Sequence, residues 1–490
     1  MKVVLIEPRS PGVHVYSKFK LPRLGLPLLG AMLERELGIR PTIYFQELGG
    51  LPWEDVLAAD LVGISTITTT APEAYAILER VKRESSSPVV MGGPHVTFLP
   101  EEALRKGADF VIRGEGEYAF VELVRRLRAG EDDFSDIPGM SYRKKGEEDV
   151  LVHNPGAPRV ENLDDLPWPD LTLIHNFEKI PIIPVMTSRG CPHNCKFCSV
   201  TKMFGRRYRF RETEDVLREL EMLHRRNPRA SIFFYDDNFT ASTRRTKELL
   251  RGMLERGIKV RWTAQATVHV IRDRELLELM RDSGCLFLYL GLESINPRTL
   301  ELYRKEQTVQ EIAEAVDVLH SYKIRVHGMF VLGSDEDDVS TIRETVRFAR
   351  KLKIDTVQFL VLTPLPGTET FDELWRQGRI LVEDWSKYSG HHVVFKPRNM
   401  TPYQLQKEGS IRSMRRFYSL WQCWKLGLLF RWWDFAIYAY AHHTISRWQA
   451  RNKQFLKDLK ERHFRPKDRD DDTPTPVKEL KAAPPRPEMK

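Results

Sequence analysis

Short apolar runs alternate with amphipathic stretches from Met1 to about Ser141. KVVLIEP, PTIYFQE and LVGISTIT have the length of buried strands, whereas GLPLLGAMLEREL and APEAYAILERVKRE space their apolar residues as helices do. Alternation of this kind is typical of a doubly wound parallel sheet, which binds ligands at the carboxyl ends of its strands. We therefore predict a Rossmann-like α/β domain over residues 1–141.

Small and hydroxyl residues follow three of these expected strands. A backbone with little side-chain bulk lets a ligand approach closely, although tight turning alone would explain the glycines equally well. The candidates are Ser65, Thr66, Gly92, Gly93, His95, Gly114 and Glu115. Residues 142–180, which include HNPGAP and LDDLPWPD, then predict an extended linker because they combine proline with acidic residues.

A second block, residues 181–390, repeats the strand and helix pattern six times. Apolar strands are expected at 181–188, 231–236, 259–266, 285–292, 325–332 and 356–363. Parallel strands joined by helices close toward a barrel, and chemistry in such barrels gathers on the loops that follow the strands. The pattern predicts a partial (β/α)6 barrel.

Polar residues follow every one of these six strands. A cysteine loop follows the first strand, Asp236, Asp237 and Asn238 the second, Gln265 to Thr267 the third, Glu293 the fourth, Gly333 the fifth and Thr363 to Thr368 the sixth. Helix capping, a salt bridge and a turn are the structural alternatives for Asp236, Glu293 and the last loop. Their recurrence at one rim favours a site.

The region 391–463 changes to aromatic and basic helices. Ile411, Met414, Phe417, Trp421, Trp424 and Leu428 recur at helical spacing. Charged residues interrupt the apolar runs before they reach the ~20 residues of a membrane span. Three interpretations stay open: a helical lid on the barrel, an interfacial segment giving peripheral membrane contact through 411–448, and a wall for an apolar substrate. Residues 464–490 are rich in proline and charge and predict a disordered tail.

Charge and cysteine content limit the partners and the cellular compartment that the sequence predicts. The chain carries a net charge of +8, but its 76 Lys and Arg alternate with 68 Asp and Glu, which is typical of a solvated surface. We predict no nucleic-acid partner and place any functional basic surface near the C-terminus. With 5 cysteines and a start, MKVVLIEPRS, that resembles a strand more than a signal peptide, the sequence predicts a reducing cytoplasmic setting.

Three of the cysteines form the most informative motif. Cys191, Cys195 and Cys198 have the spacing C-x3-C-x2-C, so one loop can bind a four-iron cluster and leave one iron open for substrate. A zinc knuckle is the alternative, but no second ligand pair follows. Cys285 and Cys423 lie far apart and are interpreted as buried apolar residues.

At these residues the chain resembles the radical S-adenosylmethionine (SAM) superfamily. Phe197 precedes the last cysteine, and the segments GGPH, RGEGE, LPWPD, DDNF, GLES and LTPLPGT follow in the order of the branch with an N-terminal cobalamin-binding domain. The resemblance covers about residues 1–390. One cobalamin pattern is missing, because the first strand is followed by IEPRSPGVH and not by D-x-H-x-x-G, so a lower axial histidine is not indicated.

The resemblance implies three cofactors and their sites. Cys191, Cys195 and Cys198 would bind a [4Fe-4S] cluster whose open iron chelates SAM, and a donor such as ferredoxin or flavodoxin would reduce it. SAM contacts are implied for Phe197, Asp236, Asp237, Asn238, Glu293 and Gly333, and cobalamin contacts for Ser65, Thr66, Gly92, Gly93, His95, Gly114 and Glu115.

Our leading hypothesis is an oxygen-sensitive, cobalamin-dependent enzyme that methylates an unactivated carbon through a 5'-deoxyadenosyl radical. A second hypothesis keeps the radical but closes or rearranges a ring, or couples two carbons, on a tetrapyrrole or lipid. A third is a non-catalytic cobalamin or redox sensor. The substrate is expected to be a small molecule, and the aromatic C-terminal helices favour a hydrophobic one.

Overall fold

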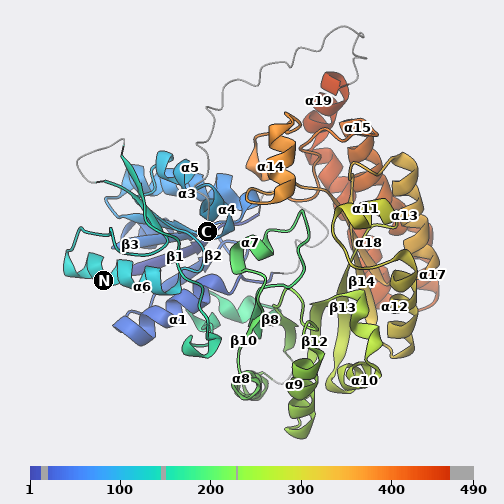
Figure 1. Ribbon diagram of the computed structural model, residues 1–490, viewed down its shortest axis with the longest axis horizontal. Coiled ribbons are helices and arrows are strands. Elements are labelled where there is room, and N and C mark those ends of the chain that lie inside the picture. Colours follow the sequence, from blue (N-terminus) through green and yellow to red (C-terminus); the bar gives the residue numbers. More distant parts are fainter. Residues whose placement is uncertain (11, 13–19, 145–149, 228–229, 464–490) are drawn as a thin grey trace.

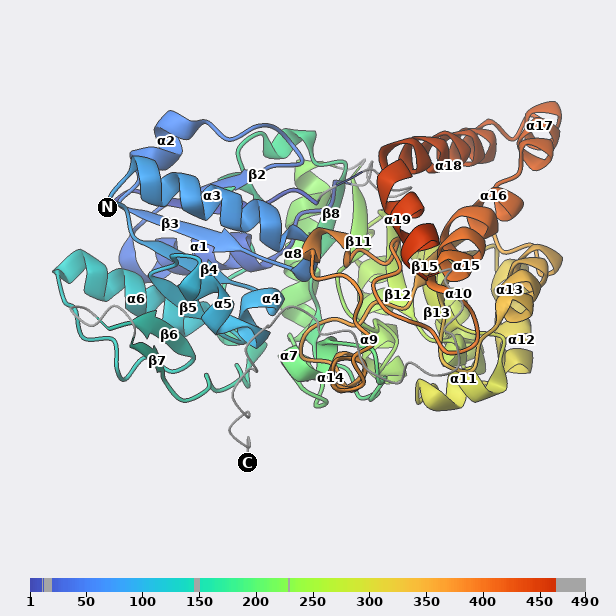
Figure 2. The same ribbon diagram turned by 90° about the horizontal axis from the view of Figure 1, so that it is seen from above.

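The computed structural model describes residues 1–10, 12, 20–144, 150–227 and 230–463. Two α/β units lie side by side, and the C-terminal helices pack on the second of them (Figure 1, Figure 2). The predicted fold class is confirmed: a Rossmann-like parallel sheet, a partial barrel and a helical C-terminal region. The predicted disordered tail, 464–490, lies outside the described residues.

The N-terminal sheet has seven strands in the order β2-β1-β3-β4-β5-β6-β7. The first five strands of the chain are parallel, and β6 and β7 run antiparallel at one edge. Their bounds are β1 Val3–Glu7, β2 Thr42–Phe45, β3 Leu61–Ser65, β4 Val89–Gly92, β5 Phe110–Ile112, β6 Met140–Arg143 and β7 Leu151–His153. The strand order reverses between β1 and β3, which is where such sheets bind ligands.

Both faces of this sheet are covered by helices. Val3 and Leu5 of β1 belong to the core under α1 and α6, whereas Val4 and Ile6 belong to the core under α3 and α5, because successive side chains of a strand point to opposite faces. The helices are α1 Gly25–Leu37, α2 Trp53–Leu57, α3 Ala71–Glu84, α4 Pro94–Phe98, α5 Pro100–Arg105 and α6 Glu117–Ala129.

The sheet continues past the boundary predicted at 141. Strands β6 and β7 pair in the segment expected to begin a linker, with Tyr142 opposite Val152. Leu173 and Ile174, farther along the same segment, are buried in the N-terminal core. These strands are three and four residues long and carry Arg143 and His153, so their apolar pattern was too weak to predict them.

The second sheet contains six parallel strands in the order β15-β14-β13-β12-β11-β8. Their bounds are β8 Ile182–Val185, β11 Ser231–Phe234, β12 Arg261–Ala266, β13 Cys285–Glu293, β14 Arg325–Leu332 and β15 Thr356–Val361. A short antiparallel pair, β9 Ser188–Arg189 and β10 Arg209–Phe210, follows β8. All six predicted strands are present, and β8, β11 and β15 end two or three residues earlier than predicted because the chain turns into the rim loops.

Helices surround this sheet on its outer side (Figure 1). The outer helices are α8 Thr213–Arg226, α9 Thr243–Glu255, α10 Arg274–Ser283, α12 Val309–Ser321 and α13 Val339–Lys351. Three short helices follow rim loops: α7 Val200–Phe204, α11 Pro297–Leu302 and α14 Glu369–Arg376. Single turns of 3-10 helix lie at η1 Thr68–Thr70, η2 Leu163–Asp165, η3 Leu171–Leu173, η4 Phe177–Lys179, η5 Val268–Arg272 and η6 Trp385–Lys387, and η7 Gln406–Arg412 is a π-helix.

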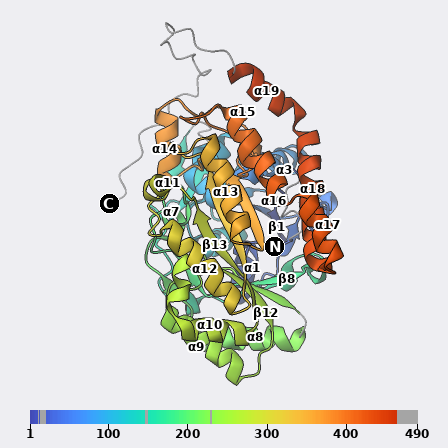
Figure 3. The same cartoon turned by 90° about the vertical axis from the view of Figure 1, so that its right-hand side faces the viewer.

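The C-terminal helices share the core of the barrel. Ile411, Met414 and Phe417 are buried there, as their periodicity predicted. Figure 3 shows α17 and α18 along one edge of the molecule, beside α16. Every helix in the described part of the chain is too short or too polar to cross a lipid bilayer. The bounds are α15 Pro402–Leu405, α16 Ser413–Phe417, α17 Leu420–Leu428, α18 Trp432–Arg451 and α19 Lys453–His463.

Candidate active site

The three motif cysteines lie on the loop between β9 and α7. Gly190 precedes them at φ +92°, and a Cβ atom there would lie 2.5 Å from the carbonyl oxygen of Arg207, so this position requires glycine. The Cys191 amide donates to the carbonyl oxygen of Gly205 (3.2 Å), and the Cys198 amide donates to that of Cys195 (3.1 Å). These contacts fix the loop before any ligand binds.

The chemistry of the three thiols suits a cluster. Burial raises the pKa of each thiol, and that of Cys198 reaches about 12. Iron would supply the positive charge that converts such thiols to thiolates. Among the described residues no three His, Cys, Asp or Glu side chains converge on a single ion. A four-iron cluster does not need that convergence, because each thiolate binds a different iron.

Asp236 holds the beginning of this loop. Its carboxylate is buried and accepts hydrogen bonds from the backbone nitrogens of Thr187 (2.9 Å) and Ser188 (2.7 Å), and from both hydroxyls. Burial raises its pKa against the effect of these hydrogen bonds. All the described contacts of Asp236 thus lie within the protein, and they place it as a support of the cysteine loop.

The next two residues differ from Asp236 in their surroundings. Asp237 lines a cavity and makes no hydrogen bond or ion pair with any described residue, and burial followed by the charge of Asp236 raises its pKa to about 7. Asn238 is buried and accepts hydrogen bonds from the backbone and hydroxyl of Thr240. Of the three rim residues, Asp237 is the one whose carboxylate is available to a cationic ligand.

Glu293 also forms an ion pair within the protein. Its Oε1 atom lies 2.9 Å from the Nζ atom of Lys305, and both side chains are largely buried. Glu293 has a left-handed φ of +58°, which is uncommon for a residue other than glycine. Burial would lower the pKa of Lys305, but the charge of Glu293 and the nearby Cys195 thiol raise it overall. A fixed ammonium group therefore lies close to the cysteine loop.

Phe197 and Gly333 have structural contacts of their own. The Phe197 ring packs edge to face on Tyr303, with 4.9 Å between centroids. Gly333 has φ +98°, and a Cβ atom there would lie 2.5 Å from the side chain of Leu405. Packing against α15 is therefore sufficient to require this glycine, and the SAM contacts predicted for Phe197 and Gly333 stay predictions.

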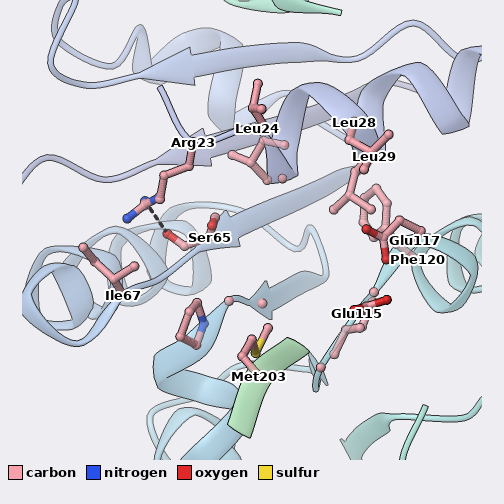
Figure 4. A pocket seen from close by; sticks show the side chains of 18 of the residues that line it. Arg23, Leu24, Leu28, Leu29, Ser65, Ile67, Glu115, Glu117, Phe120 and Met203 are labelled. Atoms are coloured by element: carbon pink, nitrogen blue, oxygen red, sulfur yellow. Dashed lines mark hydrogen bonds between the residues drawn. The ribbon is translucent and has the colours of Figure 1, made fainter. Parts of the chain in front are cut away.

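A cavity of about 350 Å³ lies between the N-terminal sheet and the barrel (Figure 4). Ser65, Gly92, Gly93, Gly114 and Glu115, all predicted cobalamin residues, line it. From the barrel side it is lined by the residues that flank the cysteine loop and the second strand end, which are Met186, Ser188, Arg189, Met203, Phe204, Tyr235 and Asp237. The two units therefore share one site.

Two predicted cobalamin residues do not line this cavity. The Thr66 hydroxyl donates to the carbonyl oxygen of Gly92 at 3.0 Å. His95 is fully buried between Tyr75 and Trp385, with its Nε2 atom 3.8 Å from Glu102. Both residues therefore support the strand ends that carry the cavity wall.

A buried charge cluster joins the two units beside the cavity. Glu115 pairs with Arg209, through contacts that include a 2.8 Å hydrogen bond, and with Arg189 at 3.4 Å. Arg189 also pairs with Glu117 at 2.6 Å. All four side chains are at most 8% exposed. Burial alone would raise the pKa of Glu115, but Arg209 and Arg189 hold it below its usual value.

Comparison with known proteins agrees with this geometry. Residues 185–349 match the radical SAM superfamily and residues 12–124 match the B12 binding domain. An uncharacterized methyltransferase of Pyrococcus horikoshii is 34% identical over 421 residues, covering 83% of this chain and 90% of that protein. The chain belongs to the cobalamin-binding branch of the radical SAM superfamily.

Further relatives of this chain carry named activities. A bacteriochlorophyllide d C-12(1)-methyltransferase of Chlorobaculum tepidum is 29% identical over 427 residues, covering 85% of this chain and 87% of that protein. An anaerobic magnesium-protoporphyrin IX monomethyl ester cyclase of Cereibacter sphaeroides is 32% identical over 382 residues, covering 74% and 60%. The cobalamin-dependent enzyme OxsB has the same fold, with a TM-score of 0.69 at 16% identity over 94% of this chain and 80% of that one.

The radical SAM assignment confirms the predicted cofactors, [4Fe-4S], SAM and cobalamin, and makes the chain an enzyme, so the sensor hypothesis is set aside. The lining of the cavity suits a cobalamin, because Gly92, Gly93 and Gly114 leave backbone open along one wall. None of its described lining residues is a histidine, but His14 lies outside the described residues, so the expectation about an axial histidine stays a prediction.

Several lining residues were missed from the sequence. Arg23 lies 3.3 Å from Glu7 and donates to the Ser65 carbonyl oxygen at 3.4 Å. Leu24, just before α1, and Leu28 within it add an apolar wall (Figure 4). A signal for them existed, because the segment after β1 lies at the point where the strand order reverses. Cys285 and Cys423 are both buried, as predicted.

Proposed function

We propose that this radical SAM enzyme methylates an unactivated carbon of a small organic substrate through a 5'-deoxyadenosyl radical. The shared cavity is the observation that supports this most directly. Ser188 and Arg189, just before Cys191, line the same space as Gly92 and Gly93 of the B12-binding domain. A methyl donor held against those glycines would lie beside the place where the radical forms.

When bound, the cofactors supply one-electron cleavage of SAM and a transferable methyl group, which no side chain can provide. The residues of the chain bind and orient. Asp237, with no described partner, suits the ammonium group of SAM, and Asp236 keeps the cysteine loop in position. The apolar wall formed by Leu24, Leu28 and Phe120 would exclude water from reactive species.

The named relatives include both methyltransferases and ring cyclases. The chain covers 90% and 87% of the two methyltransferases described above, 83% of a Synechocystis cyclase and 60% of the Cereibacter cyclase. The Cereibacter cyclase is 32% identical, so ring closure is the second candidate function. Several of the named relatives act on tetrapyrroles, and another is a hopanoid C-2 methylase, which supports an apolar polycyclic substrate.

The test uses anaerobically reconstituted enzyme with cobalamin, dithionite and SAM that carries a deuterated methyl group. Lipid and pigment extracts of the source cells serve as substrate pools. Methyl transfer predicts a product with one labelled methyl group, together with 5'-deoxyadenosine and S-adenosylhomocysteine. Ring closure predicts 5'-deoxyadenosine without a labelled product or S-adenosylhomocysteine, and that outcome would replace our proposal by the second candidate.

The same proposal includes the setting of the enzyme. Five free thiols and an oxygen-sensitive cluster suit a reducing cytoplasm. A one-electron protein donor such as ferredoxin or flavodoxin would replace dithionite in the cell. Activity supported by either protein, with its reductase and without dithionite, is the expected result; failure with both would argue for another type of donor.

A further inference from the structure

Eight large apolar side chains are exposed on α17, in the turn after it and at the start of α18. Each is 56–77% exposed, more than any other large apolar side chain in the described part of the chain. We call residues 420–433 the aromatic tip. Its exposed members are Leu420, Trp421, Trp424, Leu428, Leu429, Phe430, Trp432 and Trp433. Contiguous exposed apolar surface of this kind marks an interaction site.

The exposure results from how the chain turns. Helix α16 ends at Phe417, and α17 begins only after the cap residue Ser419, so the apolar periodicity predicted from Phe417 to Trp421 is interrupted. Trp421, Trp424 and Leu428 therefore face outward, whereas Ile411, Met414 and Phe417 are buried. Cys423 and Leu426 are the α17 residues that join the core and anchor the tip.

The aromatic tip lies away from the active site. Asp434, directly after it, pairs with Arg325, the first residue of β14. The tip is therefore at the amino end of this strand, whereas the rim loops follow the carboxyl ends. Eight residues of strand span roughly 25 Å, and Figure 2 shows α17 at the side of the molecule farthest from the N-terminal sheet. This position excludes the tip as a wall for the substrate.

The segment of the chain that contains the aromatic tip carries a strongly positive net charge. Residues 409–457 contain nine Lys and Arg and a single acidic residue, Asp434, so this segment alone has the +8 charge of the whole chain. Asp434 is neutralised by Arg325 and Arg431. Lys425, in the middle of the tip, is exposed and forms no ion pair with a described residue. Anionic surfaces attract such segments.

We propose that the aromatic tip docks this enzyme on an anionic lipid membrane. Tryptophan is suited to the boundary between headgroups and acyl chains, and Lys425 and Arg431 would lie at the level of the phosphates. A second copy of the chain is a poorer occupant, since two +8 segments would repel each other. The tip would insert only into the interface, because no described helix can span a bilayer.

The experiment measures co-sedimentation of the full-length holoenzyme with phosphatidylcholine vesicles that contain or lack phosphatidylglycerol. We expect binding to the anionic vesicles, weakened by salt. Replacing Trp421, Trp424, Trp432 and Trp433 together by Ser should weaken it roughly tenfold or more. Trp375→Ser, at an exposed tryptophan on α14, is the matched control and should bind as the wild type does.

A further variant tests the contribution of positive charge to binding, and two measurements verify that each variant is correctly folded. Lys425→Glu should weaken binding to anionic vesicles, while the iron content and the SAM cleavage of every variant stay at the wild-type level. Three results would overturn the proposal: no binding by the wild type, equal binding by the quadruple variant, or a wild-type dimer that the quadruple variant converts to a monomer. None of them bears on the methyl-transfer assay, so the two proposals fail independently.

Discussion

The Oδ1 atom of Asp236 lies 2.7 Å from the backbone nitrogen of Ser188, three residues before the first motif cysteine. Asp236, which follows β11, thus fixes the start of the cysteine loop, which follows β8. Because Asp236 also accepts the Thr187 amide, its removal would leave two buried N–H groups without acceptors. Each such group costs about 1–3 kcal/mol.

Asp236→Ala should therefore lower the free energy of unfolding by about 2–5 kcal/mol and reduce the iron bound after reconstitution. Asp236→Asn, which keeps one acceptor oxygen, should lose less. Urea unfolding and iron per chain are the measurements. Asp237→Asn is the matched control, since the neighbouring carboxylate has no described hydrogen bond and the variant should retain its iron. Full iron loading in Asp236→Ala would refute the supporting role.

Glu115 neutralises two buried arginines from the other unit, Arg189 and Arg209. Glu115→Gln leaves Glu117 as the one remaining carboxylate of the cluster, so we expect a loss of about 3–5 kcal/mol in the free energy of unfolding. Cobalamin retention should fall as well, because the cluster joins the walls of the cavity. Both effects are measurable by urea unfolding and by absorbance after gel filtration.

Glu161→Gln is the control for this prediction. Glu161 pairs with Arg207 at 3.0 Å, but the two side chains are 68% and 82% exposed, so the change should cost less than about 1 kcal/mol. If Glu115→Gln were as mild as this control, the buried cluster would not be what holds the two units together.

Lys305 and Glu293 form a second buried pair. Lys305→Met removes the ammonium and leaves a buried carboxylate, which should cost about 3–5 kcal/mol. The double variant with Glu293→Gln should be more stable than Lys305→Met alone, because no buried charge remains. A double-mutant cycle by urea unfolding measures the coupling. Additive effects of the two substitutions would show that the pair contributes no interaction energy.

Substitutions at Gly92 and Gly93 distinguish the effect of filling the cavity from the effect of straining the backbone. Gly92 lines the cavity and has an ordinary φ, and a Cβ atom there meets nothing closer than 3.9 Å. Gly93 has φ +99°, and a Cβ atom there would lie 2.4 Å from the carbonyl oxygen of Thr66. Gly92→Val should keep the fold but lose cobalamin, whereas Gly93→Ala should destabilise the fold itself.

The thermal midpoint of the cofactor-free protein and the cobalamin bound per chain distinguish these outcomes. Gly257→Ala provides a control for backbone strain alone, because its φ is +64° and a Cβ atom there has open space. It should cost about 1 kcal/mol and leave cobalamin binding intact. Normal cobalamin content in Gly92→Val would show that the cofactor does not use this wall.

The parts of the fold that the sequence predicted are those with local periodicity. The six barrel strands and the cysteine loop each consist of consecutive residues with a recognisable pattern. Position at a strand end was also enough to select Asp237 and Gly92, which line the cavity, although their contacts with cofactors stay predictions. Strands β6 and β7 were missed because they are short and polar. The pairing of Arg209 with Glu115 joins residues 94 positions apart, and no local pattern encodes it.

The sequence also could not predict how chemically similar side chains close together in the chain are oriented. Asp236 and Asp237 are indistinguishable in a sequence, and the turn after β11 directs one carboxylate into the protein and the other into the cavity. Likewise, Phe417 and Trp421 have helical spacing, yet the break at Ser419 buries the first and exposes the second. Only the path of the backbone decides such cases.

Asp237 predicts a pH dependence of stability with a definite sign. Burial raises its pKa from 3.8 to about 7 in the folded chain, so between these values the native state binds more protons than the unfolded state. Stability contributed by this group therefore falls as the pH rises through that window. Asp237→Asn removes the buried charge, and its advantage over the wild type should grow by about 2–3 kcal/mol between pH 5 and pH 8. Urea unfolding of the iron-free proteins at both pH values measures this difference, with the exposed Glu255→Gln as a control that should follow the wild type. Parallel pH profiles for Asp237→Asn and the wild type would mean that the carboxylate is solvated, and a solvated carboxylate would bind the SAM ammonium only weakly.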